Sequence, residues 1–456
     1  MTAPISLKGS PLHPRAAIDT RASLLLQDPR TKARNATEKR FRAYGLSAIV
    51  VALLALVWLL VSIFGNGLPA FRQTFMTIPV TLDAALLDKG GKRDPADLSK
   101  ATTVAYGKLL AASLGAEITA KGIDLGGMDA KALAKMISEE SPATLRNRVL
   151  ADPSLIGTTI NFTLLASGRI DGYYKGRVSL ESAALDKNTS PEQLAMADKL
   201  KAAGVLSTSF NTGFMTMPDA SDKRPEAAGL GVAIVGSLYM MFVVLALALP
   251  IGVATSVYLE EFAPKNKFTD LIEVNIANLA AVPSIVYGIL GLSIFINFAG
   301  LPQSAPIVGG LVLTLMTLPR IIIPTRAALK AVPPSIRDAA LGIGASRLQT
   351  ITHHVLPLAM PGILTGTIIG LAQALGETAP LLLIGMVAFV RDFPGAPPEG
   401  LFDPASALPV QIYNWTQRGD PGFVERASGA IIVLLVFLIA MNAVAIYFRR
   451  KFERRW

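Results

Sequence analysis

The chain contains no cysteine and only three histidines among its 456 residues. Disulfides, thiolate metal sites and cysteine nucleophiles are therefore excluded, and we expect neither a metal nor a cofactor. Charged residues are also scarce, at 17 % of the chain against about 25 % in ordinary soluble domains. No G-x-x-x-x-G-K-[ST] run is present, so the chain has no P-loop of its own with which to hydrolyse ATP.

Hydrophobic residues, in contrast, make up 51 % of the chain. They gather in runs long enough to cross a membrane, which takes about 20 apolar residues in a helix. We therefore predict an all-α polytopic membrane protein with about six transmembrane helices. The predicted segments are 45–64, 230–259, 272–299, 306–324, 358–390 and 430–448. We expect a kink at Ala281-Val282-Pro283-Ser284 in the third, and a break or a re-entrant piece at Gly376-Glu377-Thr378-Ala379-Pro380 in the fifth.

These runs divide the chain into four parts. Residues 1–43 form a basic tail, 44–65 the first transmembrane helix, 66–228 a soluble domain, and 229–456 a membrane core with the other segments. The soluble domain mixes charges of both signs, and no catalytic constellation is visible in it. Its apolar spacing predicts helices at 101–114, 129–150 and 191–203, and paired strands at 158–166 and 170–178 joined at Ser167-Gly168-Arg169. We expect an α+β domain inserted between the first two membrane helices.

Lys and Arg crowd the two ends of the chain and the short loops, which is how membrane proteins use them. The net charge of +10 therefore does not point to nucleic acid. With the basic tail in the cytoplasm, the loops that carry Lys265, Arg326 and Arg337 fall inside, whereas the uncharged loop 300–305 falls outside. We predict a multi-pass protein of the cytoplasmic (inner) membrane, in contact with lipid, with both termini cytoplasmic and the α+β domain extracytoplasmic.

The loop 333–357, between the fourth and fifth spans, is expected to hold a short helix with defined ends. Two prolines stop the preceding helix, Ser335 is expected to cap the new one, and Asp338 occupies the capping-box position. A surface with little side-chain bulk, on which another backbone can approach closely, is formed by Ala339, Ala340, Gly342 and Gly344. The alternative interpretation is a generic amphipathic loop helix without a partner.

This stretch resembles the EAA signature of ABC importer permeases, whose coupling helix docks into a groove on a cytoplasmic ATPase. Asp338 stands where that family has glutamate, and His354 departs from an apolar position. The residues that match are Ala339, Ala340, Gly344, Leu356 and Pro357. The loop lies between two late spans on the side that the charges make cytoplasmic, which favours the coupling helix over the generic alternative.

Further segments resemble the phosphate permeases of the Pst system, most of all their PstA subunits. They are 234–239, 248–254, 258–261, 281–288, 376–382 and 408–415. The resemblance implies a type I ABC importer permease fold, a transport pore subunit that is not an enzyme, and inorganic phosphate as the substrate. It also implies a second permease subunit (PstC-like), a cytoplasmic ATPase dimer (PstB-like) and a periplasmic phosphate-binding protein (PstS-like) as partners. The basic tail and the domain 66–228 are not part of the family's common core.

One position departs from the family pattern. The family has an arginine shortly before Gly-Glu-Thr-Ala-Pro, whereas this chain has Gln373 there. Arg320 lies deep in the fourth span and is a candidate replacement that would attract an anion, since charges inside a span usually face the bundle interior. The alternative is an arginine that snorkels to the cytoplasmic end of its helix.

Glu377 would repel an anion, so we expect it to pair with a cation or to cap the broken helix, with gating as the alternative. Thr378 beside it belongs to the same candidate pathway.

Other functions are also left open. A permease for molybdate or sulfate would share the coupling motif. An ion-coupled phosphate carrier would need more acidic residues near the midplane and inverted repeats. A membrane-anchored enzyme or sensor would work through the domain 66–228.

The topology can be tested with protease added to sealed, right-side-out spheroplasts. We expect cleavage within 66–228 and none in either terminal tail, because only that domain faces outward in the predicted map. Permeabilised spheroplasts, in which the tails become accessible, are the control. Cleavage of the N-terminal tail in sealed spheroplasts would overturn the map.

Overall fold

The computed structural model describes residues 29–88, 93–94, 98–386 and 389–452, which fall into two compact units, 1–61 and 62–456. The described part of the first unit belongs to one helix, α1 (Pro29–Gly67), whose last turn lies in the second unit. This helix contains the predicted span 44–65 but begins well before it, because Pro29 suits a first turn and no proline or glycine follows until Gly45. The rest of the predicted tail, 1–28, lies outside the described residues.

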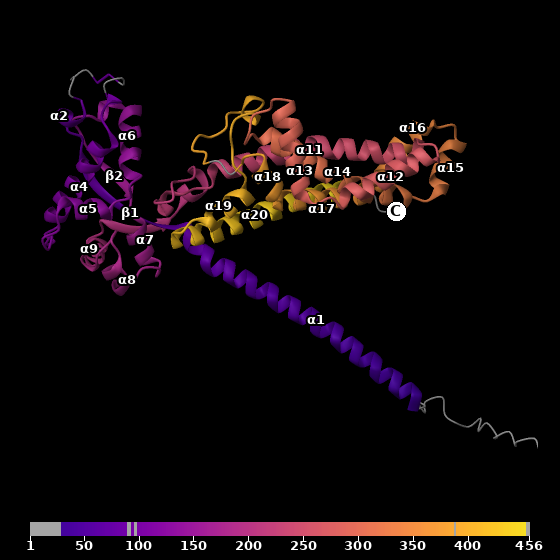
Figure 1. Ribbon diagram of the computed structural model, residues 1–456, viewed down its shortest axis with the longest axis horizontal. Helices are drawn as coiled ribbons and strands as arrows, with labels where there is room; N and C mark the ends of the chain where they lie inside the picture. Colours follow the sequence, from indigo (N-terminus) through magenta and orange to yellow (C-terminus); the bar gives the residue numbers. More distant parts are fainter. Residues whose placement is uncertain (1–28, 89–92, 95–97, 387–388, 453–456) are drawn as a thin grey trace, which may run out of the picture. The chain divides into compact units, whose positions relative to one another are not determined.

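The second unit begins with an α+β part built on an antiparallel sheet in the order β2-β1-β3 (Figure 1). Its strands are β1 (Arg72–Thr81), β2 (Thr159–Leu165) and β3 (Leu206–Phe210). Alternate residues of β1, namely Met76, Ile78 and Val80, are fully buried in the core of this part, as the two-residue period of a strand requires. Short elements complete it: η1 (Leu68–Phe71), α2 (Ala84–Leu87), η2 (Pro153–Leu155), α8 (Leu180–Leu185), α10 (Thr212–Thr216) and η3 (Pro225–Ala227).

The helices predicted for this part are present with shifted bounds. The first is α4 (Thr103–Ala120), and the last is α9 (Pro191–Ala202), which starts at a capping box formed by Ser190 and Gln193. The middle one is two helices, α5 (Ala130–Met136) and α6 (Ser141–Ala151). They are separate because Ile137 leaves the helix to form a β-bridge with Ala166.

The predicted hairpin is wrong. Strand β2 is present, but its partner is β1, far earlier in the chain, with Thr77 opposite Thr163. The segment expected to be its second strand is instead helix α7 (Gly168–Tyr174), which buries Ile170 in the core. Its Asp171 accepts a hydrogen bond from the backbone of Thr74 at 3.0 Å, which ties the helix to β1. Pairing across so long a stretch of chain leaves no local signal in the sequence.

The rest of the second unit is helical. Its long elements are α11 (Gly231–Val257), α12 (Lys267–Ala280), α13 (Ser284–Gly291), α14 (Pro306–Lys330), α17 (Leu356–Gly376), α19 (Leu408–Gln417) and α20 (Pro421–Phe452). Shorter ones are η4 (Tyr258–Phe262), η5 (Leu292–Phe298), α15 (Pro334–Gly342), α16 (Arg347–Thr350), η6 (Ile351–Val355), α18 (Ala379–Leu383) and η7 (Glu399–Leu401).

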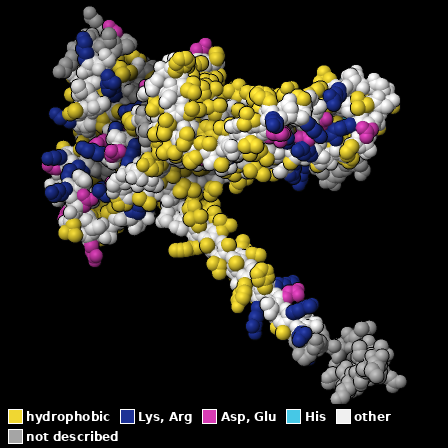
Figure 2. Space-filling view, turned by 45° about the vertical axis from the view of Figure 1, so that its right-hand side comes forward, with side chains coloured by type: hydrophobic (Ala, Val, Ile, Leu, Met, Phe, Trp, Pro, Cys, Tyr) yellow, Lys and Arg dark blue, Asp and Glu magenta, His cyan; other side chains and the backbone are white. Residues whose placement is uncertain are grey.

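Among the described residues, five helices are long and apolar enough to cross a membrane, or six if a bent pair counts as one span. That pair is α12 with α13 and η5, bent by 101° at the segment where a kink was predicted. The predicted break in the fifth segment is also present, since α17 ends at Gly376 and α18 starts at Ala379. In Figure 2, hydrophobic side chains cover much of the visible side of these helices, and Lys and Arg gather towards the end that carries α15 and α16.

Helices α11, α14, α17 and α20 run side by side (Figure 1). Glycines let their backbones approach closely, as is common between membrane helices. A Cβ on Gly310 of α14 would lie 2.5 Å from Cβ of Val243 in α11. A Cβ on Gly366 of α17 would lie 2.6 Å from Cβ of Pro324 in α14. A larger residue at either position would therefore push the helices apart.

A cluster of buried polar residues joins the α+β part to the first turns of α20; we call it the charged seat, and it consists of Gln73, Lys175, Glu226, Glu425 and Arg426. Arg426 is 1 % exposed and donates hydrogen bonds to Gln73 Oε1 at 2.7 Å and to three backbone carbonyls, those of Ala70, Pro225 and Glu226. Glu425 beside it pairs with Lys175 at 2.8 Å. Buried charges require partners, and here the two halves of the unit supply each other's.

Glu226 is the acidic group of the seat that the α+β part contributes. Its Oε1 accepts a hydrogen bond from the hydroxyl of Ser138 at 2.6 Å. Burial raises the pKa of Glu226 to about 7, against the opposing effects of that hydrogen bond and of Arg426. At neutral pH the carboxyl is therefore protonated in a substantial share of molecules, and the seat avoids a full buried negative charge there.

Replacing Arg426 by Met is expected to loosen the seat. The change removes four buried hydrogen bonds and, among the described residues, leaves the backbone carbonyl of Glu226 without a donor, a loss of about 3–5 kcal/mol. Hydrogen–deuterium exchange in β1 and in 225–228 should rise accordingly in the protein reconstituted into nanodiscs. The matched control is Arg391→Met, which removes an ion pair with Glu140 from a side chain 48 % exposed, and which should cost under about 1 kcal/mol. Equal exchange in the two variants would contradict a structural role for the seat.

Candidate functional site

The structure brings together two of the charged residues that the sequence placed deep in the membrane core. Arg320 lies in α14, and Glu377 follows the last residue of α17. Their closest charged atoms, Nη1 of Arg320 and Oε1 of Glu377, are 3.8 Å apart, and the side chains are 23 % and 20 % exposed. Gly370 of α17 packs against this part of α14: a Cβ at that position would lie 3.2 Å from Cγ2 of Thr317 and 3.8 Å from Cβ of Arg320.

This pair is loose, which matters for what it can do. A separation of 3.8 Å is an ion pair but is too long for a hydrogen bond. In the part of the chain that the structure describes, Nη1 of Arg320 is buried and has no hydrogen-bond acceptor. The guanidinium therefore keeps unused donors in apolar surroundings, where an anion is strongly attracted.

The other candidate residues of the pathway lie beside this pair in the chain. Gln373 is exposed and lies one turn before Glu377 along α17. Thr378 is the residue that precedes α18, and its side chain makes no capping hydrogen bond. Gln373, Glu377 and Thr378 thus stand around the break between α17 and α18, and Arg320 reaches that break from α14.

A second arginine shares surroundings with Arg320. Both Arg320 and Arg449 of α20 line a cleft of about 490 Å³ between α14, α17 and α20. In the sequence, Arg449 is one of several basic residues that directly follow the last predicted span, 430–448. A basic residue in the last turns of a membrane helix is so common that its sequence position carries no signal of a site.

The predicted coupling loop contains the expected short helix, α15, but its start differs from the prediction. Pro333 precedes the helix and Ser335 lies within it, so the serine does not cap it. Arg337 holds it in place instead. Its guanidinium donates to the carbonyls of Val332 at 2.7 Å and Leu329 at 2.9 Å, and pairs with Glu261 at 2.7 Å. These contacts fix α15 to the end of α14 and to η4, which follows α11.

The loop presents both small and large apolar residues to solvent. Asp338, Ala339 and Gly344 are exposed, whereas Ala340 is 4 % exposed and packs inward. Large apolar side chains stand out beside them, with exposed fractions of 45 % for Leu341, 84 % for Ile343 and 61 % for Leu348. An exposed apolar group of this kind is typical of a surface that binds a partner. Leu356 and Pro357 begin α17 and are half-buried.

Gly344 has a structural role that the sequence did not reveal. Its φ is +90°, and a Cβ there would have nothing within 4 Å. The position therefore needs glycine for its backbone conformation. Gly342 has the same open surroundings with an ordinary φ, so it is the better residue for testing contact with a partner.

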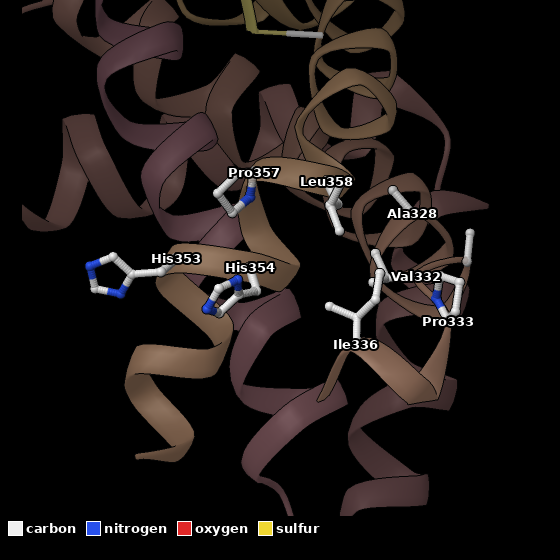
Figure 3. Close-up of a pocket in the computed structure, with 9 residues that line it drawn as sticks. Ala328, Val332, Pro333, Ile336, His353, His354, Pro357 and Leu358 are labelled. Carbon is white, nitrogen blue, oxygen red and sulfur yellow. The ribbon is translucent and has the colours of Figure 1, made fainter. Parts of the chain in front are cut away.

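A pocket of about 620 Å³ lies behind this surface (Figure 3). Val332 and Ile336 line it from the α14–α15 side, His354 lines it from η6, and Pro357 and Leu358 line it from the start of α17. Among the described residues, no cluster of three or more His, Cys, Asp or Glu has the arrangement of a metal site. Most of the residues that line the pocket are apolar, and the pocket lies next to α15, the helix that resembles the EAA coupling helix.

Two family models match separate parts of the chain, one in the helical part and one over α1 and much of the α+β part. A model described as the binding-protein-dependent transport system inner membrane component matches residues 248–456. A model described as a domain of unknown function matches residues 28–184.

Individual relatives match the helical half. A probable ABC transporter permease, YqgI of Bacillus subtilis, is 34 % identical over 230 residues, which are 48 % of this chain and 78 % of the relative. The phosphate transport system permease protein PstA of Mycobacterium leprae is 34 % identical over 230 residues, 50 % of this chain and 73 % of the relative. PstA 1 of Mycobacterium tuberculosis H37Rv is 32 % identical over 229 residues, 50 % of this chain and 72 % of the relative.

Among solved structures, an inward-facing MetNI methionine ABC transporter aligns with a TM-score of 0.38 at 17 % identity, covering 50 % of this chain and 95 % of that one. A bacterial transporter for alginate import gives the same TM-score at 16 % identity, covering 49 % of this chain and 79 % of that one. TM-scores this low do not establish a shared fold, so the family assignment rests on the sequence relatives and the family model.

Proposed function

The chain belongs to the family of ABC transporter permeases that includes the PstA proteins, and from this membership we propose that it carries inorganic phosphate across the cytoplasmic membrane as one permease subunit of an ATP-driven importer. The observation that carries the proposal is the 34 % identity over 230 residues to a protein named as a phosphate transport system permease, PstA of Mycobacterium leprae. The charge distribution supports both termini in the cytoplasm and the α+β domain on the outside.

Three partners follow from this proposal. The chain has no P-loop, so ATP is hydrolysed by a PstB-like ATPase dimer in the cytoplasm. The apolar side chains and small residues of α15 and the turn after it form the surface that docks on it. A PstC-like permease completes the pore, and a PstS-like binding protein delivers phosphate from outside, on the side where we place the α+β domain.

Arg320 and Glu377 form the candidate anion step of the pathway. Phosphate at neutral pH carries about one to two negative charges, which is at least the charge of the Glu377 carboxylate. An arriving phosphate therefore competes with Glu377 for the unused donors of Arg320. Glu377 neutralises the arginine when no substrate is present and replaces the substrate as it leaves. The pair thus supplies attraction without trapping the anion.

The proposal is tested by purifying the intact complex and measuring uptake of labelled phosphate into vesicles. Uptake should require ATP and the binding protein, and it should continue after an ionophore abolishes the ion gradients. Uptake driven by an ion gradient without ATP would instead support an ion-coupled carrier. Uptake of sulfate or molybdate in place of phosphate would reassign the substrate and leave the transport class intact.

The role of Arg320 predicts a specific rescue. Arg320→Gln should lower the initial rate of phosphate uptake by at least about tenfold with the complex still assembled, because one charge-assisted contact is lost. Adding Gln373→Arg should restore part of the rate, since it returns a cation to the same break. Arg320→Lys should fall between, because the charge remains but the planar fork does not.

Rates in this series are normalised to the amount of complex and to its ATPase activity. Full activity of Arg320→Gln would show that the residue only snorkels. Loss of activity without rescue would keep Arg320 important and reject the idea that position 373 can substitute for it.

If α15 docks on the ATPase subunit, a bulky side chain at Gly342 should disrupt that contact. Gly342→Leu should leave the fold intact, because a Cβ at this position meets nothing within 4 Å and the side chain extends from open surroundings, but it should release the ATPase subunit from the purified complex. The matched control is Gly419→Leu, another exposed glycine with open surroundings, which lies between α19 and α20. If both variants retain the ATPase equally, α15 is not the docking surface.

A further inference from the structure

The cleft between α14, α17 and α20 has the composition of an anion site. Its volume is about 490 Å³, and its walls are Arg320, Pro324, Pro361, Gly362, Thr365, Gly366, Ile369 and Arg449. Two of these side chains are guanidinium groups, one is a hydroxyl, and none is a carboxylate. The remaining residues are apolar or glycine, so the charges act with little dielectric screening.

Neither arginine is fully neutralised. Among the residues that the structure describes, Arg449 has no carboxylate within ion-pair distance, and its one contact is a long hydrogen bond of 3.4 Å from Nη1 to Oγ1 of Thr365. Thr365 in turn donates to the carbonyl of Pro361 at 2.7 Å, which fixes its oxygen towards Arg449. Within the same described part of the chain, Arg320 has one ion-pair partner, Glu377 at 3.8 Å, and its Nη1 is buried without an acceptor.

Two half-satisfied arginines in one apolar cleft are costly unless something anionic joins them. We propose that the cleft is a second oxyanion site on the pathway, in which Arg320 and Arg449 together bind hydrogen phosphate on its way to the cytoplasm. The inference rests on the proposed function and extends it to a residue, Arg449, that the motifs do not include. Arg320 then serves two positions: it meets the anion beside Glu377 and passes it to the cleft, where Arg449 is the second donor.

The chemistry suits a step that must also release its ligand. Each guanidinium offers parallel N–H donors that match two phosphate oxygens. The cleft is open rather than enclosed by a full shell of donors, so the anion keeps part of its hydration. The phosphate of an anionic phospholipid has the same chemistry and could reach a cleft at a helix end, so the experiment must separate the two sources.

The first measurement compares neighbouring arginines. Arg449→Gln should lower ATP-driven phosphate uptake on the order of tenfold, and Arg449→Lys should lower it less. The matched control is Arg450→Gln, which removes the same charge from the next, exposed residue, outside the cleft, and should retain the wild-type rate. Equal rates for Arg449→Gln and Arg450→Gln, in a complex whose wild type takes up phosphate, would reject this inference and leave the proposed function standing. A wild type that takes up no phosphate would instead reject the proposed function itself.

The second measurement reads occupancy of the cleft without transport. The chain has no cysteine, so Ile369→Cys places one thiol of this chain in the cleft wall, and any cysteines of the other subunits are replaced by serine beforehand. An anionic thiosulfonate reagent should modify it faster than a cationic one of similar size, and Arg449→Gln should abolish that preference. Inorganic phosphate should slow the anionic reagent in nanodiscs of phosphatidylcholine alone.

The lipid composition then identifies the source of the anion. Protection that needs inorganic phosphate and is the same with or without phosphatidylglycerol supports the phosphate site. Protection that needs phosphatidylglycerol and ignores inorganic phosphate would overturn it in favour of a lipid headgroup site. No protection under either condition, with equal rates for the two reagents, would also overturn it.

Discussion

Arg426 is the single side chain on which the arrangement of the second unit depends most. It sits at the start of α20 and donates to η1, to β1 and to the residues before α11. Asn211 also donates to Ala70 and Gln73, but among the described residues the carbonyl of Glu226 has no donor besides Arg426. The insertion between the first two predicted spans is thereby fixed to the last helix of the chain by hydrogen bonds instead of hanging from its own two connections.

A charge removed from water needs a partner in the membrane core as well. The charged side chains there have fewer hydrogen-bond partners than Arg426 has. Arg426 donates four hydrogen bonds of 2.7–3.2 Å, whereas among the described residues Arg320 has one carboxylate at 3.8 Å and a buried nitrogen without an acceptor. Full satisfaction suits a joint that holds two parts together. An arginine with unused hydrogen-bond donors suits a position where a ligand accepts those hydrogen bonds during part of the transport cycle. The unused donors lower the stability of the protein when no ligand is bound.

Sequence reasoning reached the features that leave local signals. Apolar runs located the membrane helices, and proline and glycine marked the bend before α13 and the break after α17. It also placed Arg320 and Glu377 deep in the core, and the structure pairs them. It failed where the cause was distant in the chain: the partner of β2 is β1, and the support of α15 is Arg337 with Glu261 rather than Ser335. Arg426 and Arg449 looked like ordinary basic residues of a helix, because only the fold shows what they face.

One property of α20 connects the charged seat with the arginine cleft. The helix runs unbroken for 32 residues with no proline after its first, whereas α11, α14 and α17 each contain at least one internal proline. Glu425 in the seat and Arg449 at the cleft are separated by about 36 Å along its axis at about 1.5 Å per residue. A helix without an internal proline resists sharp bending, so movement at one end is transmitted to the other. A tilt of its first turns, which carry Glu425 and Arg426, therefore moves Arg449 near its other end, and the position of Arg449 in the cleft depends in part on the α+β part.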